Sequence, residues 1–253
     1  MGTTTTVTLG KKSVTVTNIS NNDWQEAVVE RIIEETPNVK TYSFILPEPA
    51  HHVAGQHYEL QLTAANGYQA ARPYSASSTA DDMPLLNLTI QHVPDGEVTT
   101  YLADNLEVGD AVEIRGPFGK FFTWTEEDTQ PILLIAGGSG VVPMHSILAS
   151  HKAANAKSEM QLFYSARTFK DIIFKDDFLN MSNVTITLTQ NDSDDWTGVT
   201  GRINSALFAK TLKKFSKTPL CYVCGMNGFV SATTDILQEL GIPVENIKTE
   251  RFG

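Results

Sequence analysis

The chain has 253 residues and a mass of 27.7 kDa, which suits one large domain or two modest ones. Hydrophobic residues make up 41% and charged residues 19%, a composition that excludes a disordered chain. The net charge of −10 argues against general nucleic-acid binding, which needs a basic surface. Two cysteines, Cys221 and Cys224, are too few for a disulfide scaffold or a four-thiolate iron–sulfur cluster.

The acidic excess is confined to one half of the chain. Residues 1–128 carry 7 basic and 18 acidic side chains, a balance of −11, whereas residues 129–253 carry 12 and 11, a balance of +1. Two units with different surfaces are therefore expected. The N-terminus lacks the basic start of a secretory signal, and no stretch approaches the roughly 18 apolar residues of a membrane span. We expect a cytoplasmic protein with no membrane span, no nucleic-acid partner and no metal site.

Residues 1–22 are rich in Thr, Ser and Asn, and their apolar residues indicate either a short hairpin around Gly10-Lys11 or a flexible N-terminal extension. From residue 23 to about 128, short apolar runs alternate with Pro, Gly, Asn and Asp turns. This pattern predicts a small antiparallel barrel or sandwich. Its expected strands are 27–33, 42–46, 58–62, 86–90 and 111–114.

The pattern changes after residue 128. Pro131–Ala136 is a continuous apolar run, typical of a strand buried on both faces of a parallel sheet. Strands and helices then alternate, which predicts a doubly wound α/β domain over 129–253. Further strands are expected at 160–165, 184–189 and 220–224, and helices at 142–154, 176–179, 205–215 and 229–240. Gly241 is placed to end the last helix as a left-handed cap.

A glycine-rich loop, Gly137 to Pro143, joins the first buried strand to its helix. Glycines let a backbone approach a bound group closely, and the amides of a helix N-terminus favour an anion. Pro143 suits the first helical turn, where a missing N–H costs nothing. The loop therefore predicts a dinucleotide phosphate site, and the alternative is a tight turn with no ligand.

The first half offers a second candidate site. Arg72-Pro73-Tyr74-Ser75 follows an Ala-rich stretch expected to be a turn, and it supplies a guanidinium fork for phosphate oxygens and a ring for stacking. The alternative is a polar strand with one exposed arginine. Gly96–Leu102 predicts a turn that opens a short helix, a second terminus suited to an anion. Gly116–Phe121 by itself predicts only a turn.

Taken together and in order, these segments resemble the ferredoxin–NADP reductase superfamily, in particular its bacterial oxygenase-reductase branch. The segments are 72–75, 96–102, 116–121, 137–143, 164–167, 201–203, 224–225 and 250–253. The resemblance implies an antiparallel β-barrel FAD-binding domain at 23–128, followed by an NAD(P)-binding α/β domain at 129–253. It also implies hydride transfer from NAD(P)H to FAD.

The resemblance further implies a role for each matching residue. Ser75, Cys224, Glu250 and Phe252 would be catalytic: the serine near the hydride-accepting nitrogen, the cysteine beside the nicotinamide, and the phenylalanine near the flavin. The residues that would bind FAD are Arg72, Pro73, Tyr74, Ser75, His92, Val93, Gly96, Val98, Thr99 and Phe252. Those that would bind the nicotinamide dinucleotide are Gly138, Gly140, Pro143, Arg167, Arg202, Cys224 and Gly225.

Cys221 and Cys224 are spaced as C-x-x-C, a pattern that also occurs in dithiol redox sites. Here both lie in an apolar strand, where residues three apart point to opposite faces with Cα atoms about 10 Å apart. That separation excludes a disulfide. We therefore expect Cys221 to fill the core and Cys224, at the strand end, to be the functional cysteine.

The choice of dinucleotide is less clear-cut. Arg167 and Arg202 match positions where NADPH-using relatives bind the extra phosphate, whereas the acidic stretch 190–195 would repel it. The residues favour NADPH slightly over NADH. With no cysteines to spare, the electron acceptor is expected to be separate: a ferredoxin-like protein, an oxygenase or a small oxidant. The basic run 210–217 is either its docking surface or a solvated helix face. The competing function is a non-catalytic flavin-binding electron-transfer subunit of a larger complex.

Overall fold

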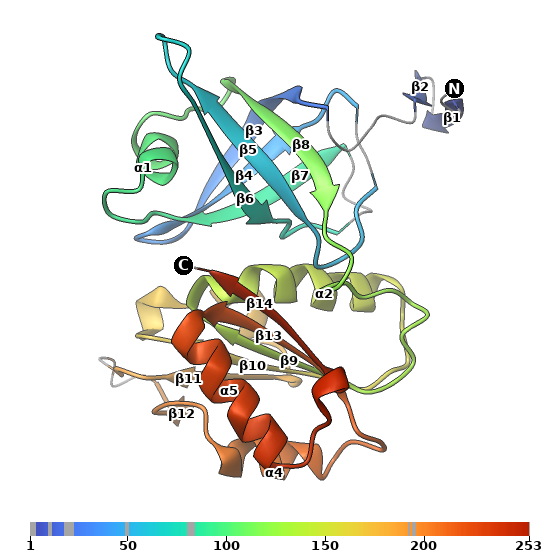
Figure 1. Ribbon diagram of the computed structural model, residues 1–253, viewed down its shortest axis with the longest axis vertical. Helices are drawn as coiled ribbons and strands as arrows, with labels where there is room; N and C mark the ends of the chain where they lie inside the picture. The colour runs from blue at the N-terminus through green and yellow to red at the C-terminus, as the bar shows by residue number, and fades with distance from the viewer. Residues whose placement is uncertain are drawn as a thin grey trace.

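The computed structural model describes residues 4–9, 12–17, 23–48, 51–79, 84–191, 193 and 196–252. Strands β1 (Thr4–Leu9) and β2 (Lys12–Thr17) pair antiparallel, as the hairpin interpretation predicts. The expected turn at Gly10-Lys11 lies outside the described residues. The remaining described residues form two halves stacked on each other, a β-barrel and an α/β unit (Figure 1).

The first half is a six-stranded antiparallel barrel in the order β6-β5-β8-β3-β4-β7. The barrel closes through an antiparallel bridge between Ala76 and Leu88, just beyond the end of β6. A short helix covers one open end and places Val98 and Leu102 in the barrel core. The elements are β3 (Gln25–Thr36), β4 (Val39–Ile45), β5 (His57–Thr63), β6 (Gln69–Ser75), β7 (Leu85–Gln91), α1 (Glu97–Asp104) and β8 (Ala111–Phe118).

Two turn predictions in this half are wrong. The Ala-rich stretch before Arg72 belongs to strand β6, which runs from Gln69 through Ser75. Because β6 is the first strand of the sheet order, Pro73 is tolerated there without a ladder hydrogen bond. Strand β8 likewise continues through Gly116-Pro117 to Phe118, where a turn was expected.

The second half is a parallel sheet in the order β12-β11-β10-β9-β13-β14. Its strands are β9 (Ile132–Gly137), β10 (Met160–Ala166), β11 (Val184–Leu188), β12 (Val199–Thr200), β13 (Leu220–Met226) and β14 (Ile247–Phe252). Its helices are α2 (Val141–Ala153), α3 (Lys175–Phe178), α4 (Ser205–Leu212) and α5 (Asn227–Glu239), with single 3-10 turns at Gly138–Gly140, Phe169–Asp171 and Val244–Asn246.

Helices cover both faces of this sheet, which confirms the doubly wound architecture. One face packs with α2 and α3 into a core that includes Ile147 and Phe178, on the side of the barrel (Figure 1). The opposite face packs with α4 and α5 around Phe208 and Leu237. Gly241 follows α5 with a φ of +84°, the expected left-handed cap.

Three elements of this half differ from the prediction. Helix α4 ends at Leu212, three residues before the expected Phe215. Strands β12 and β14 were not predicted: β12 has two residues, and β14, an edge strand, has four consecutive polar residues between Ile247 and Phe252. Among the described residues, no helix is long and apolar enough to cross a membrane.

Candidate functional site

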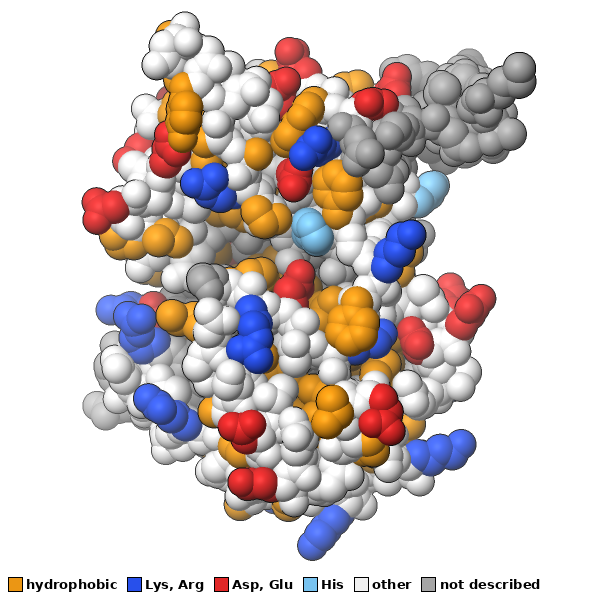
Figure 2. Space-filling view, in the orientation of Figure 1, with side chains coloured by type: hydrophobic (Ala, Val, Ile, Leu, Met, Phe, Trp, Pro, Cys, Tyr) orange, Lys and Arg blue, Asp and Glu red, His pale blue; other side chains and the backbone are white. Residues whose placement is uncertain are grey.

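A cavity of about 430 Å³ lies at the junction of the two halves. Its barrel side is formed by the end of β6, the end of β7 and the first turn of α1, and its other side by the start of α2 and the end of β14. The lining residues are Arg72, Pro73, Tyr74, Ser75, Thr89, Ile90, Gln91, Val93, Gly96, Glu97, Val98, Thr99, Ser139, Val142, Arg251 and Phe252. Figure 2 shows this junction as a hollow between the upper and lower halves.

Two hydroxyl groups of strand β6 have no hydrogen-bond partner. The Ser75 Oγ and the Tyr74 Oη are both buried and unpaired. Burial raises the pKa of Tyr74 to about 12, so its hydroxyl stays protonated and can donate. Buried polar atoms are nearly always paired in folded proteins, so two orphaned hydroxyls on a cavity wall indicate a polar ligand.

Arg72 lies next to these hydroxyls with most of its donors free. Its Nη1 donates to the Ala71 carbonyl oxygen at 2.8 Å, and the side chain is otherwise exposed. A guanidinium has five N–H donors in a planar fork, which matches the oxygens of a phosphate. The end of β6 therefore combines a phosphate-binding group with donors for a planar ring system.

The turn before α1 forms the second part of the barrel side. The Thr99 Oγ1 accepts from the Val93 amide at 3.2 Å and lies within 3.3 Å of the Gly96 carbonyl, which closes the turn. A Cβ on Gly96 would lie 2.5 Å from that hydroxyl, so only glycine fits. Helix α1 has no side-chain cap, which leaves its first amides available to an anion. Val98 supplies only backbone, because its side chain is in the barrel core.

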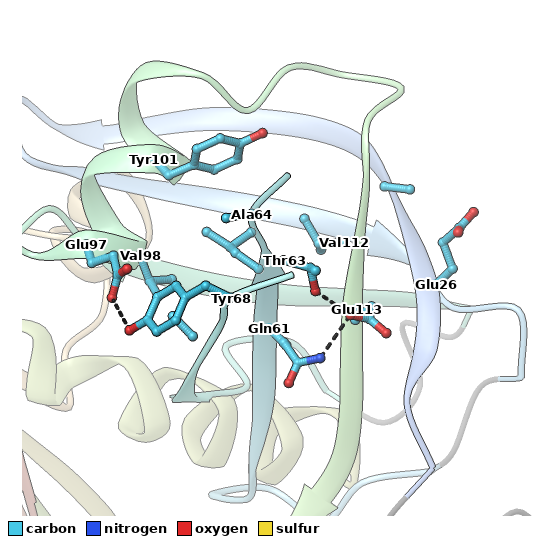
Figure 3. A pocket seen from close by; sticks show the side chains of 13 residues that line it. Glu26, Gln61, Thr63, Ala64, Tyr68, Glu97, Val98, Tyr101, Val112 and Glu113 are labelled. Carbon is cyan, nitrogen blue, oxygen red and sulfur yellow. Dashed lines mark hydrogen bonds between the residues drawn. The ribbon is translucent and has the colours of Figure 1, made fainter. Parts of the chain in front are cut away.

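A second cavity, of about 370 Å³, lies on the other side of α1 and shares Glu97 and Val98 with the first (Figure 3). Its polar groups bond to one another: the Tyr68 hydroxyl donates to Glu97 at 3.3 Å, and Gln61 donates to Glu113 at 2.9 Å. None of the buried, unpaired side-chain atoms found in the described part of the chain lines this cavity. The second cavity is thus internally satisfied, and the first is the better candidate site.

The loop between β9 and α2 lies at the point where the strand order of the sheet reverses, between β9 and β13. Gly138 has a φ of +57° and open space around its Cα, whereas a Cβ on Gly140 would lie 2.2 Å from the Cys224 carbonyl oxygen. The missing side chain of Gly140 therefore lets the loop pack against the backbone of Cys224, whereas Gly138 leaves its own backbone exposed. Pro143 lies in the first turn of α2 and is buried.

The strand ends beside this loop bring Cys224 and Glu250 together as register partners of β13 and β14. Burial raises the pKa of the Cys224 thiol well above its usual value and that of Glu250 to about 7. One oxygen of Glu250, Oε2, is buried without a partner. Phe252, at the end of β14, lines the cavity, and Gly225 follows Cys224 with a φ of +153°.

Cys221 and Cys224 are both free and buried, and they pack into cores on opposite faces of the sheet. The exclusion of a disulfide between them is confirmed. Of the dinucleotide-binding candidates, Arg167 and Arg202 are exposed after the ends of β10 and β12. Three residues of the opposing acidic stretch, Asp192, Asp194 and Asp195, lie outside the described residues.

Two further sequence candidates, His92 and the basic run 210–217, do not line the cavity. His92 lines a separate cavity of about 200 Å³, and its Nε2 lies 3.3 Å from the Thr100 hydroxyl. The lysines of the run 210–217 are exposed on and just after α4, at the end of the α/β half farthest from the barrel (Figure 1).

Sequence reasoning missed seven lining residues: Thr89, Ile90, Gln91, Glu97, Ser139, Val142 and Arg251. Ser139 and Arg251 lie inside segments that the sequence analysis identified, so their position next to predicted site residues could have indicated them. Thr89, Ile90 and Gln91 belong to an ordinary barrel strand, and only the closure of the barrel brings them beside Ser75.

Family models match both halves: an oxidoreductase FAD-binding domain over residues 26–123 and an oxidoreductase NAD-binding domain over residues 134–235. The chain is 30% identical to a component of the Na(+)-translocating NADH-quinone reductase of Haemophilus influenzae, over 87% of this chain and 58% of that component. It is 28% identical to NADH-cytochrome b5 reductase 2-A of Vanderwaltozyma polyspora, covering 90% and 84% of the two chains.

Solved structures agree with these matches. A cytochrome P450 reductase from Amycolatopsis has a TM-score of 0.79 at 25% identity, covering 91% of this chain and 70% of that one. A ferredoxin NADP+ reductase from Neisseria gonorrhoeae has the same fold, with a TM-score of 0.77 at 20% identity, covering 90% and 98%. The chain spans about 58% of the length of the first curated relatives it matches. It belongs to the ferredoxin–NADP reductase superfamily and combines an oxidoreductase FAD-binding domain with an oxidoreductase NAD-binding domain.

Proposed function

We propose that the protein transfers a hydride from NAD(P)H to FAD bound in the junction cavity and passes the electrons to a separate acceptor. The observation that carries the proposal is the pair of buried, unpaired hydroxyls, Tyr74 Oη and Ser75 Oγ, on the wall of a cavity between the two halves. A flavin presents ring nitrogens and oxygens, ribityl hydroxyls and a pyrophosphate, which fit these hydroxyls and the free donors of Arg72. Bound FAD supplies the hydride-accepting ring and can release electrons singly or in pairs.

The residues of the barrel side would orient the flavin. Ser75 would hydrogen-bond beside the reacting edge of the ring, and the ring of Tyr74 would stack on its face. Arg72 and the free amides at the start of α1 would hold the pyrophosphate, next to the turn formed by Val93, Gly96 and Thr99. Glu97, the one acid of that first turn, has its carboxylate engaged by Tyr68, in the neighbouring cavity (Figure 3).

The residues of the α/β half would bring the nicotinamide against the flavin. The Gly138–Pro143 loop would bind the dinucleotide phosphates, and Cys224 and Gly225 would flank the nicotinamide ring. Phe252 would cover the flavin until the nicotinamide displaces it, because its side chain already lines the cavity. Replacing Phe252 by Ala should therefore tighten nucleotide binding, measured by titration of the oxidised protein; an unchanged affinity would exclude this covering role.

Glu250 would hold or deliver a proton near the reacting rings. Burial raises the pKa of its carboxyl to about 7, close to neutral pH. A general acid or base works best when its pKa is close to the working pH. The Cys224 thiol stays protonated, since burial and the neighbouring carboxyl both raise its pKa.

We further propose that the protein favours NADPH, through Arg167 and Arg202. Both guanidinium groups are exposed after the carboxyl ends of parallel strands, on the edge where dinucleotides bind. Replacing Arg167 by Ala should weaken NADPH more than NADH, by about tenfold for one lost charge-assisted pair. The ratio of the two turnover rates before and after substitution tests this, and an unchanged ratio would remove the argument.

The deciding experiment mixes the flavin-loaded protein anaerobically with NADPH or NADH and follows the flavin absorbance. Bleaching supports the reductase, whereas no bleaching with either nucleotide supports a non-catalytic electron-transfer subunit. A colourless purified protein that takes up no added FAD would contradict both. Adding a ferredoxin-like protein, an oxygenase component or ferric complexes to the bleached protein then identifies the acceptor class, by return of the oxidised spectrum.

A further inference from the structure

A histidine on α2 forms a hydrogen bond between the two halves of the molecule. The His145 Nδ1 lies 2.8 Å from the carbonyl oxygen of Ser77, a barrel residue 68 positions earlier. Its other ring nitrogen, Nε2, lies 3.2 Å from the Asp177 carboxylate. The imidazole is stacked on Phe174, with ring centroids 4.0 Å apart and planes inclined by 26°. The ring is thus held on one face and at both nitrogens.

Both partners of the ring are hydrogen-bond acceptors. A backbone carbonyl and an ionised carboxylate both accept hydrogen bonds and donate none. The bond to His145 also holds the pKa of Asp177 below its usual range, so that carboxylate is charged near neutral pH. Each ring nitrogen therefore faces an acceptor, and Nδ1 donates to Ser77.

The residue after His145 makes a parallel bond. The Ser146 hydroxyl donates to the Ser78 carbonyl oxygen at 2.8 Å, and the same oxygen also lies 2.9 Å from the His52 Nε2. Ser77 is fixed from the barrel side as well, because its amide donates to Asn87 at 2.9 Å. Two successive carbonyls of the barrel are therefore joined to two successive residues of α2.

These bonds lie between the two parts of the site. Ser77 follows Ser75 by two residues, and His145 follows Pro143 of the glycine-rich loop by two residues. The path from the unpaired hydroxyl of β6 to the nucleotide loop thus crosses the junction through two adjacent hydrogen bonds, and the bond of His145 is the one nearer to Ser75 in the chain. These two bonds join the segments that would hold the reacting rings.

We propose that His145 is a positioning residue: its hydrogen bond to Ser77 sets the spacing between the flavin-binding end of β6 and the nucleotide-binding start of α2. The inference rests on the proposed hydride transfer, which requires reacting atoms about 3–3.5 Å apart. The bond to Ser77 crosses the junction, whereas the bond to Asp177 remains within the α/β half. The two ring nitrogens therefore have separable effects.

Two amide variants separate the two bonds. The amide of Asn lies two bonds from Cβ, as Nδ1 does, so His145→Asn retains a donor for Ser77 and loses the Asp177 pair. The amide of Gln lies three bonds from Cβ, as Nε2 does, so His145→Gln retains the Asp177 contact and loses the bond to Ser77. His151→Gln is the matched control, because His151 is on the same helix and its ring nitrogen bonds to Ser158 within its own half; its only ring contact with the barrel half among the described residues is with Trp124, at 5.4 Å between centroids, and it makes no bond to segment 75–79.

The readouts are the nucleotide dissociation constant, the limiting rate of flavin bleaching in stopped flow, and amide hydrogen exchange of segment 75–79 in the flavin-free protein. We expect His145→Gln to lower the limiting rate about tenfold, with the dissociation constant within about twofold, because spacing affects the transfer step rather than binding. His145→Asn should recover most of the lost rate. Amide hydrogen exchange in segment 75–79 should be faster in His145→Gln than in His145→Asn. The control His151→Gln should match the wild type in all three measurements.

The outcomes separate this inference from the proposed function. A wild type that bleaches, with His145→Gln bleaching equally fast, overturns the inference and leaves the function intact. Equal loss in the Asn and Gln variants also overturns it, since the Asp177 pair or the ring stack would then be responsible. A wild type that does not bleach overturns the function, and hydrogen exchange alone then decides whether His145 holds the β6 end.

Discussion

The Ser75 hydroxyl is buried at the end of an edge strand with no hydrogen-bond partner, beside a cavity. An unpaired buried hydroxyl costs about 1–3 kcal/mol, a cost that a bound polar ligand can offset. Ser43 provides the comparison: its hydroxyl is also buried and unpaired, but it lines none of the described cavities. The two serines share their chemistry and differ in what they face.

Replacing Ser75 by Ala should lower the rate of flavin bleaching by about 100-fold, the cost typical of one lost donor at a reacting group. Flavin binding should persist, because Arg72, Tyr74 and the α1 turn remain. Ser43→Ala is the matched control and should leave the rate unchanged, with equal or higher stability since an unpaired hydroxyl is removed. Comparable rates in the two variants would exclude a catalytic role for Ser75.

Glu250 carries a stability cost that depends on pH. Its folded-state pKa, about 7, lies above its ordinary value of 4.5, so the folded protein binds this proton more tightly than the unfolded chain. The favourable contribution is therefore fully present below pH 4.5 and is lost as the pH rises to about 7. Natural proteins keep such destabilised groups where function needs them, which supports the assignment of Glu250 to the site.

The Glu250→Gln variant removes this titration. Between about pH 5 and pH 8, the wild type should lose about 2.5 kcal/mol of unfolding free energy relative to the variant, from the linkage of the two pKa values. Urea denaturation of both proteins at several pH values measures the difference. A constant difference across this range would mean that the carboxyl does not titrate there.

At the scale of elements, the loop between β9 and α2 contains two glycines with different roles. Gly138 has a positive φ and open surroundings, whereas Gly140 is pressed against the carbonyl of Cys224. Gly140→Ala should therefore displace the loop and cost several kcal/mol of stability along with nucleotide affinity. Gly138→Ala should cost about 1 kcal/mol, since only the backbone conformation is strained. Thermal unfolding and nucleotide titration of both variants check this order, and equal costs would contradict it.

The elements that sequence reasoning predicted correctly are those whose pattern reflects burial. Strand β9 is buried on both faces and reads as a continuous apolar run, and α5 is bounded by its cap at Gly241. The strands that were not predicted, β12 and β14, are at sheet edges, and so is β6, whose Ala-rich start was expected to be a turn; polar side chains and even Pro73 are compatible with pairing at an edge. Edge strands show weaker sequence patterns, and here β6 and β14 both line the cavity.

The features of the candidate site also divide into those that the sequence predicts and those that it does not. Arg72, Tyr74, Ser75 and Phe252 were found through short ordered segments, because each segment is contiguous in sequence. The bond between His145 and Ser77 spans 68 residues, and nothing near either residue predicts it. Contacts of this kind depend on how the two halves dock, which local pattern and propensity do not specify.

At the scale of the whole molecule, the two halves are joined at a second place, around Thr123. Its carbonyl oxygen accepts from the Tyr222 hydroxyl at 2.7 Å and from the Lys248 ammonium at 3.0 Å. The adjacent residues, Phe122 and Trp124, pack into the core of the α/β half, and Phe122 meets the Tyr222 ring edge-on at 5.2 Å. The segment that leaves the barrel is thus buried in its neighbour, and the junction is fixed at two places, by the bond of His145 and by the bonds to Thr123.

Because two donors share the Thr123 carbonyl, their removal should be strongly non-additive. Tyr222→Phe and Lys248→Met should each cost about 1 kcal/mol, since the other donor still pairs the oxygen. The double variant leaves a half-buried carbonyl without either donor, so its cost should exceed the sum of the single costs by about 1 kcal/mol. Urea denaturation of the wild type, the two single variants and the double variant measures the four free energies of unfolding that the comparison needs.

The rate of flavin bleaching should fall in the same order, because a loosened junction no longer holds β6 and α2 at a fixed spacing. Additive costs with an unchanged rate in the double variant would show that Thr123 does not hold the halves together.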